Sequence, residues 1–168
     1  EGHYRELLWI LDNSYIEGQT DKKEFLNKIG IKYDSTENRY YYEAVEGYDY
    51  SNLVSGAAEY NEANLIKDSD IKAIQRAVIW YYTNYMEDKT NDAVFNKKDS
   101  VDWLNISTDG TTYQALSDYN KFATTDIGAL RNEQAMVLYN YLIDAAAKNA
   151  NQYTAENNYT INKGTTIN

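Results

Sequence analysis

Residues 68–87 read DSDIKAIQRAVIWYYTNYME, and this stretch decides how the whole chain is interpreted. Its apolar residues recur at spacings of three and four, which predicts an α-helix over Asp70–Met86 with an Asp or Ser at positions 68–70 as its cap. The buried stripe of this helix is predicted to comprise Ile71, Ile74, Val78, Tyr81 and Tyr85. Further apolar residues leave little of the circumference polar, which places the helix in the middle of the domain.

Gln75 interrupts this apolar face. It lies one helical turn from Ile71 and Val78, so its primary amide points at apolar neighbours. An amide that is buried without partners costs roughly 2–7 kcal/mol. Two interpretations follow: either a nearby main-chain group satisfies the amide, or the amide takes part in chemistry.

The segments before the central helix predict two shorter helices. Residues 3–18, HYRELLWILDNSYIEG, have one apolar stripe that ends at Gly18 and comprises Leu7, Leu8, Leu11 and Tyr15. Residues 20–30, TDKKEFLNKIG, have Thr20 or Asp21 as N-cap and Gly30 as the stop. The buried face of this second helix is predicted to comprise Phe25, Leu26 and Ile29.

The remaining segments predict a smaller β component and one long helix. Residues 31–65 are rich in Tyr and Gly and favour short strands and turns. In residues 91–128 we predict a helical turn at Asp99–Leu104, a turn at Asp109-Gly110 and a helix around Tyr113–Tyr119. Residues 131–155 predict the last helix, and residues 158–168 an edge strand. The buried positions of the last helix are Ala135, Leu138, Leu142 and Ala145.

These elements predict a single domain over residues 1–168, of α+β class and mainly α-helical: a compact helical domain with a few short peripheral β-strands. The formal net charge is −10 and no basic block occurs, so nucleic acid is a poor partner. No apolar run is long enough to predict membrane insertion. His3 is the only histidine, and we expect neither a metal nor a cofactor.

The segment around Gln75 resembles a known motif. Residues 73–83, AIQRAVIWYYT, are similar to the glutamine motif of the thioester domains of Gram-positive surface adhesins and pilus tips. That motif is an apolar residue, Gln, two variable positions and two apolar residues, filled here by residues 74–79. LLWILDNSYIEG (7–18) and EQAMVLYNYLIDAA (133–146) are similar to the segments that precede and follow it, so the resemblance covers most of the chain.

The resemblance implies covalent chemistry at Gln75. In such domains this side chain is joined to a cysteine thiol with loss of ammonia, and the resulting internal thioester is a stored acyl donor. By resemblance, the partner is an amine, such as a lysine, on a host surface or extracellular-matrix protein. The module is expected to be extracellular, as part of a larger protein anchored in the cell wall. Because each bond is used once, we expect no enzymatic turnover.

The chain departs from the family in having no cysteine. We therefore interpret residues 1–168 as a fragment of a thioester domain whose cysteine-bearing segment precedes Glu1, with substitution or natural loss as the other options. Gln75 is the only site residue that the resemblance assigns, as the acyl donor.

Two alternative functions stay open. One is a non-covalent adhesin or structural stalk domain of the same fold. The other is a helical carbohydrate-active enzyme, suggested by 18 tyrosines and 3 tryptophans. We expect core packing rather than sugar stacking for Trp9, Trp80 and Trp103. The carboxylates available to such an enzyme, which nothing in the sequence pairs, are Glu24, Glu37, Glu43 and Glu46.

Overall fold

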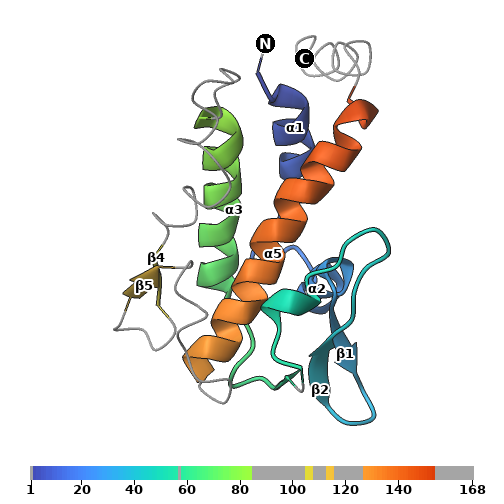
Figure 1. Cartoon of the computed structure of the whole chain (residues 1–168), viewed down its shortest axis with the longest axis vertical. Coiled ribbons are helices and arrows are strands. Elements are labelled where there is room, and N and C mark those ends of the chain that lie inside the picture. Colours follow the sequence, from blue (N-terminus) through green and yellow to red (C-terminus); the bar gives the residue numbers. More distant parts are fainter. Residues whose placement is uncertain (1, 57, 85–104, 108–112, 116–126, 154–168) are drawn as a thin grey trace.

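The computed structural model describes residues 2–56, 58–84, 105–107, 113–115 and 127–153. Helices dominate these residues (Figure 1), which confirms the predicted α+β, mainly α-helical fold. The α-helices are α1 (Tyr4–Asp12), α2 (Lys22–Ile29), α3 (Asp68–Asn84) and α5 (Ile127–Asn149). The described residues also contain the 3₁₀ turns η1 (Ser51–Leu53) and η3 (Ala150–Gln152).

Within the described part of the chain, two small antiparallel sheets accompany the helices. The first has the order β1-β2-β3, with strands β1 (Ile31–Asp34), β2 (Arg39–Tyr42) and β3 (Glu59–Tyr60). It confirms the strands predicted within residues 31–65, and its buried tyrosines Tyr40 and Tyr60 are directly paired. The second sheet pairs β4 (Asn105–Ser107) with β5 (Tyr113–Ala115).

The predicted helix around Tyr113–Tyr119 is wrong where the structure describes it. Residues 113–115 form strand β5, in which Tyr113 pairs with Ser107. An aromatic residue fits a pleated strand well, and the pairing with β4 outweighs the weak helical period of this short segment.

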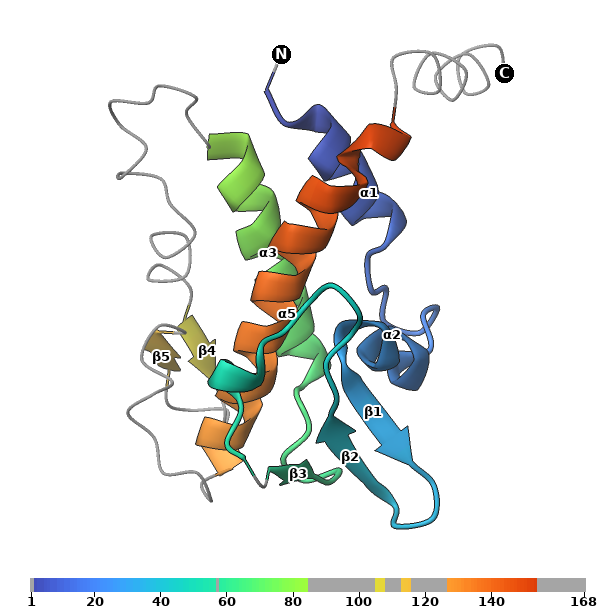
Figure 2. The same cartoon turned by 45° about the vertical axis from the view of Figure 1, so that its right-hand side comes forward.

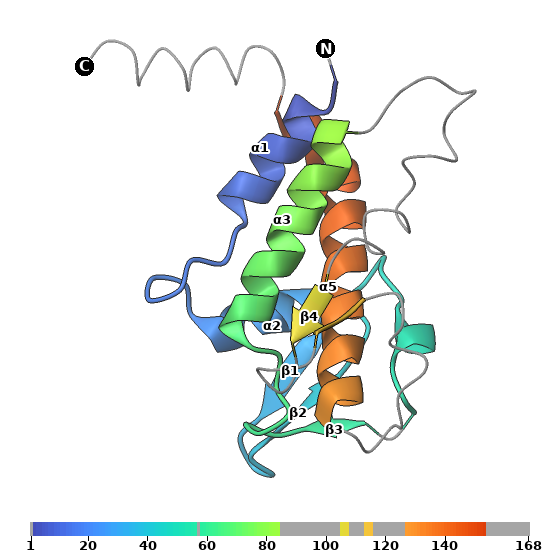
Figure 3. The same ribbon diagram turned by 90° about the vertical axis from the view of Figure 1, so that its left-hand side faces the viewer.

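Helices α3 and α5 lie side by side through the length of the molecule, and α1 packs against both (Figures 1 and 3). The β1–β2 hairpin lies beside α2 at one end of this helical core (Figure 2). Three residues of the predicted α3 stripe, Ile71, Ile74 and Val78, are completely buried. The central helix therefore forms the middle of the core, as predicted.

The rest of the α3 prediction needs two corrections. Tyr81, which the predicted stripe includes, is only half-buried, whereas its neighbour Tyr82 is buried. The predicted core packing of Trp80 is wrong, since this side chain is 44% exposed. It lies on the face of α3 that points away from Ile71 and Ile74. Trp9 is buried in the core, as predicted.

Helix α1 is shorter than predicted and presents a different face to the core. It ends at Asp12 because the side chains of Asn13 and Ser14 donate hydrogen bonds back to the carbonyl groups of Trp9 and Ile10. Leu11, predicted to be buried, is 61% exposed. Tyr15 is buried, but it belongs to the following loop and not to the helix.

Helix α2 has the predicted boundaries. The Asp21 carboxylate accepts a hydrogen bond of 3.1 Å from the Glu24 amide, which caps the first turn. Gly30 ends the helix with φ of +101°, and a Cβ there would lie 2.8 Å from the Glu43 carbonyl oxygen. Only glycine fits this position.

Several predictions fall on parts of the chain outside the described residues. These are Trp103, Tyr85, residues 99–104, the Asp109-Gly110 turn and the edge strand at 158–168. Within the described residues, no helix combines the length and the apolar character that a membrane span requires.

Candidate functional site

Gln75 lies on α3, where that helix faces the loop between α1 and α2. This α1–α2 loop comprises residues 13–20. The Gln75 side chain is 9% exposed and belongs to the buried polar groups of the structure. The residue that carries the resemblance is therefore inside the domain, close to its surface.

The Gln75 amide makes two hydrogen bonds to a single residue of the α1–α2 loop. Its Oε1 accepts a hydrogen bond from the Tyr15 N–H at 2.6 Å, and its Nε2 donates to the Tyr15 carbonyl oxygen at 3.2 Å. One amide thus satisfies both main-chain groups of a buried residue, as a neighbouring strand would. The pairing matches the first interpretation of Gln75, in which a main-chain group satisfies the buried amide.

A second set of contacts holds Tyr15 against α3. Its hydroxyl donates to the Asp68 carboxylate at 3.0 Å, and Asp68 also forms an ion pair of 3.0 Å with Lys22. Burial, followed by the bond to Asp68, raises the pKa of Tyr15 to about 12. At neutral pH the hydroxyl is therefore protonated and remains the donor.

The loop is also ordered by its own contacts. The main-chain N–H groups of Gln19 and Thr20 both donate to the Ile16 carbonyl, and Gly18 takes a φ of +82° in this turn. The Tyr15 ring packs against Phe25 of α2, with ring centroids 5.3 Å apart. Since the loop is fixed on three sides, the position of the Gln75 amide is fixed too.

This geometry favours one type of chemistry at the Gln75 side chain. A main-chain N–H at 2.6 Å from Oε1 polarises the carbonyl bond and would stabilise negative charge that develops on this oxygen during nucleophilic attack. The apolar residues around it, Ile71, Ile74 and Val78, limit access of water. The arrangement therefore suits acyl transfer better than proton transfer.

A second buried glutamine, which the sequence reasoning missed, makes the same type of contact. Gln134 on α5 accepts a hydrogen bond from the Ile66 N–H at 2.9 Å and donates to the carbonyl groups of Asn64 and Leu130. Its neighbour Glu133 accepts from the Ser55 N–H and from the Tyr60 hydroxyl. In the sequence, the signal for these two residues is that Glu133 and Gln134 stand directly before the apolar run at residues 135–138.

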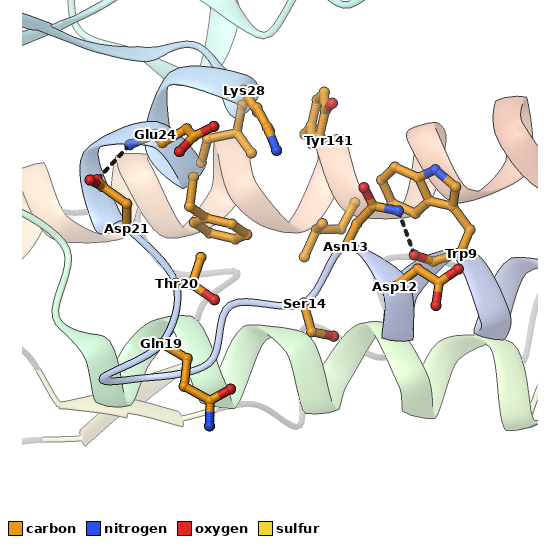
Figure 4. Close-up of a pocket in the computed structure, with 13 residues that line it drawn as sticks. Trp9, Asp12, Asn13, Ser14, Gln19, Thr20, Asp21, Glu24, Lys28 and Tyr141 are labelled. Carbon is orange, nitrogen blue, oxygen red and sulfur yellow. Dashed lines mark hydrogen bonds between the residues drawn. The ribbon is translucent and has the colours of Figure 1, made fainter.

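A pocket of about 340 Å³ lies between α1, the α1–α2 loop, α2 and α5 (Figure 4). Gln75 is not among the residues that line it, although the pocket shares the α1–α2 loop with the Gln75 site. The lining residues are Trp9, Asp12, Asn13, Ser14, Gln19, Thr20, Asp21, Glu24, Phe25, Lys28, Ile29, Tyr141 and Leu142.

The carboxylates considered for glycoside hydrolysis do not come together in this pocket. Of the four, only Glu24 lines it. Glu37, Glu43 and Glu46 are all exposed on other segments. In the part of the chain that the structure describes, His, Asp and Glu side chains form no group of three that could hold a metal ion.

Comparison of the chain with models of protein families, with curated proteins and with solved structures found no match.

Proposed function

We propose that this domain is a covalent adhesion module in which Gln75 is the acyl donor of an internal thioester. Its setting would be the extracellular surface of a Gram-positive bacterium, within a larger protein anchored in the cell wall. Its partner would be an amine on a host surface or extracellular-matrix protein. The bond is used once, so the activity is attachment and not turnover.

One observation supports this proposal most: the Gln75 amide is buried, held in a single orientation, and has a hydrogen-bond donor on its oxygen. The Tyr15 N–H lies 2.6 Å from Oε1, where the negative charge of a tetrahedral intermediate would develop. The resemblance of residues 73–83 to the glutamine motif supports the same residue.

The proposed chemistry has two steps. A cysteine thiolate attacks the Gln75 side-chain carbonyl, a C–S bond forms, the C–N bond breaks, and the nitrogen leaves with a proton as ammonia. A lysine amine then attacks the thioester carbonyl, a C–N bond forms, and the thiol is released. Because a thioester carbonyl receives less electron donation than an amide carbonyl, the second step is favourable.

The cysteine has to come from outside residues 1–168, because these contain none. The test therefore uses a longer polypeptide from the same gene that includes a cysteine together with residues 1–168. It is incubated with a biotin-labelled primary amine, and covalent capture is followed on a denaturing gel. Capture by this polypeptide, and its loss on changing the cysteine to serine, is the expected result.

A matched pair of variants assigns the acyl donor. Gln75→Ala removes the proposed electrophile, whereas Gln134→Ala removes a second buried amide, one that only holds the main chain of a loop. Capture is expected to disappear in the first variant and to persist in the second, provided circular dichroism shows that both fold. Equal capture by both variants would exclude Gln75 as the donor.

A non-covalent adhesin or stalk domain of the same fold is the second candidate. The observation that favours it is the pairing of both Gln75 amide atoms with Tyr15, since a fully paired amide needs no further explanation. In this case the longer polypeptide would capture no labelled amine, and Gln75→Ala would lower only stability.

A further inference from the structure

The pocket beside the α1–α2 loop has an apolar floor. Trp9 from α1, Phe25 and Ile29 from α2, and Leu142 from α5 are all buried residues of the core that also line the pocket. Tyr141 adds a third aromatic ring, and Figure 4 shows it across the pocket from the α1–α2 loop. Such a floor favours a ligand with an aliphatic or aromatic portion.

Three neutral polar side chains of the pocket, Asn13, Ser14 and Thr20, make hydrogen bonds within the protein itself. The Asn13 amide donates to the Trp9 carbonyl at 2.8 Å, and the Ser14 hydroxyl donates to the Ile10 carbonyl at 2.7 Å. The Thr20 hydroxyl accepts from the Ile16 N–H at 2.8 Å. A saccharide is recognised by convergent polar groups of this kind, so their use within the loop disfavours a sugar.

Charged groups are what the pocket offers to a ligand. Three carboxylates line it, from Asp12 at the end of α1 and from Asp21 and Glu24 at the start of α2, against the single ammonium group of Lys28. All four side chains belong to exposed residues, at the rim (Figure 4). The excess of negative charge favours a cationic ligand and disfavours an anion.

Two of the three carboxylates, Asp12 and Asp21, favour one of the two common cationic side chains over the other. One oxygen of Asp12 already accepts a hydrogen bond from the Tyr153 hydroxyl, and one oxygen of Asp21 accepts from the Glu24 amide. Each of these two groups therefore has one oxygen left for a ligand. A guanidinium group is best bound by both oxygens of one carboxylate, whereas an ammonium group binds single oxygens as a point charge.

We propose that this pocket binds a lysine side chain of a protein partner, with its methylene stem on the apolar floor and its ammonium group among Asp12, Asp21 and Glu24. The inference goes beyond the proposed function and does not rest on it, because non-covalent lysine binding needs neither Gln75 nor a cysteine.

The test is an NMR titration of the chain as it stands, which contains no cysteine and so reports binding without covalent capture. The probe is Nα-acetyl-lysine N-methylamide at low ionic strength. Binding is expected to shift the indole N–H signal of Trp9 and the side-chain amide signal of Gln19, both of which line the pocket. The norleucine analogue, which has the stem without the charge, is expected to leave both signals unchanged.

Variants that change charge at nearly constant shape locate the site. Asp21→Asn keeps a good helix cap, and combined with Glu24→Gln it removes two negative charges from the rim. Affinity for the lysine probe is expected to fall by roughly fivefold or more. The matched control, Glu37→Gln with Glu46→Gln, removes two exposed charges that do not line the pocket and is expected to change affinity by less than about twofold.

Lys28→Met provides a change of opposite sign, because it removes the competing ammonium group and keeps an unbranched side chain. Affinity is expected to rise in this variant. Equal affinity loss in the pocket and control double variants would overturn the proposal, since it would show only a general effect of net charge. Tighter binding of the matching arginine probe, or the absence of shifts at Trp9 and Gln19, would also overturn it.

Discussion

Two buried glutamines occupy comparable positions in this molecule and differ in ways that matter for function. Gln75 on α3 and Gln134 on α5 each use a side-chain amide to satisfy the main chain of a loop far away in sequence. Gln134 is completely buried and bonds to three main-chain groups. Gln75 is 9% exposed and bonds to one residue only.

The comparison shows that a buried amide within an apolar helix does not by itself indicate a reactive site. Gln134 meets this criterion as well as Gln75 does, and its contacts explain it fully. What separates Gln75 is its place near the surface and its position in the motif-like segment 73–83. The proposed chemistry therefore depends on access to Gln75, which the following variants examine.

The largest loss of stability is expected for Gln134→Ala. This change leaves the Ile66 N–H and the Asn64 carbonyl without a partner in a buried region and also opens a small cavity. The free energy of unfolding is expected to fall by about 4 kcal/mol. Urea unfolding followed by circular dichroism measures it. A loss below about 1 kcal/mol would mean that a water molecule replaces the amide. Gln134 would then not be a suitable structural control for Gln75.

A loss of stability of similar size, but dependent on pH, is expected from Asp70. This buried polar residue of α3 does not hold a loop far away in sequence by side-chain hydrogen bonds as the two glutamines do. Asp70 is 4% exposed and its Oδ2 has no hydrogen-bond partner in the described structure. Burial raises the pKa of Asp70 from 3.8 to about 6, although a hydrogen bond from the Lys67 main chain and the charges of Lys67, Arg131 and Lys22 oppose this shift.

Because the pKa of Asp70 is higher in the folded state than in the unfolded state, the folded state binds the proton more tightly. The stabilisation is fully present below pH about 4 and is lost as the pH rises to about 6. The loss amounts to about 3 kcal/mol. Urea unfolding at several pH values measures it, and Asp70→Asn is expected to remove this part of the pH dependence. An unchanged slope in Asp70→Asn would assign the dependence to other groups.

A smaller effect is expected for Gln75→Ala, because only one loop residue loses its partners, whereas Gln134 bonds to three main-chain groups. The free energy of unfolding is expected to fall by about 2 kcal/mol. Hydrogen exchange at the Tyr15 amide should become faster in this variant, whereas exchange at the Ile66 amide should respond to Gln134→Ala instead. Faster exchange at the Ile66 amide in Gln75→Ala, or at the Tyr15 amide in Gln134→Ala, would show that the two glutamine sites are not independent.

The smallest effect is expected for Tyr15→Phe. This variant loses the hydroxyl bond to Asp68 but keeps both main-chain bonds to Gln75, so stability is expected to fall by about 1 kcal/mol. Amine capture by the longer polypeptide should be unchanged. A loss of capture with retained folding would show that the tyrosine hydroxyl, and not only the main chain of the loop, positions the site.

The sequence predicted local features better than distant contacts. The cap at Asp21 and the stop at Gly30 depend on neighbouring residues only, and both are confirmed. Burial of Gln75 followed from its apolar neighbours within one turn. By contrast, the predicted stripe over residues 3–18 is wrong at Leu11, because α1 turns Trp9 and Ile10 towards the core and Leu11 away from it.

The partners of the two glutamines could not be predicted because they lie far away in the sequence. Tyr15 precedes Gln75 by 60 residues, and the loop that Gln134 holds precedes it by almost 70. No periodicity reports such pairings, since they depend on how α1, α3 and α5 pack together. The same reason explains why the pocket, whose walls come from three helices and a loop, was not anticipated.

The central claim, that Gln75 is an acyl donor, is tested most directly by the intact mass of a longer polypeptide that carries the cysteine, before and after treatment with methylamine. The account predicts a mass one ammonia below the sequence value, and then one methylamine added to this lower mass, with the modification mapped to Gln75. A mass equal to the sequence value and unchanged by methylamine would contradict it. Gln75 would then be a structural residue that holds a loop by hydrogen bonds, as Gln134 does.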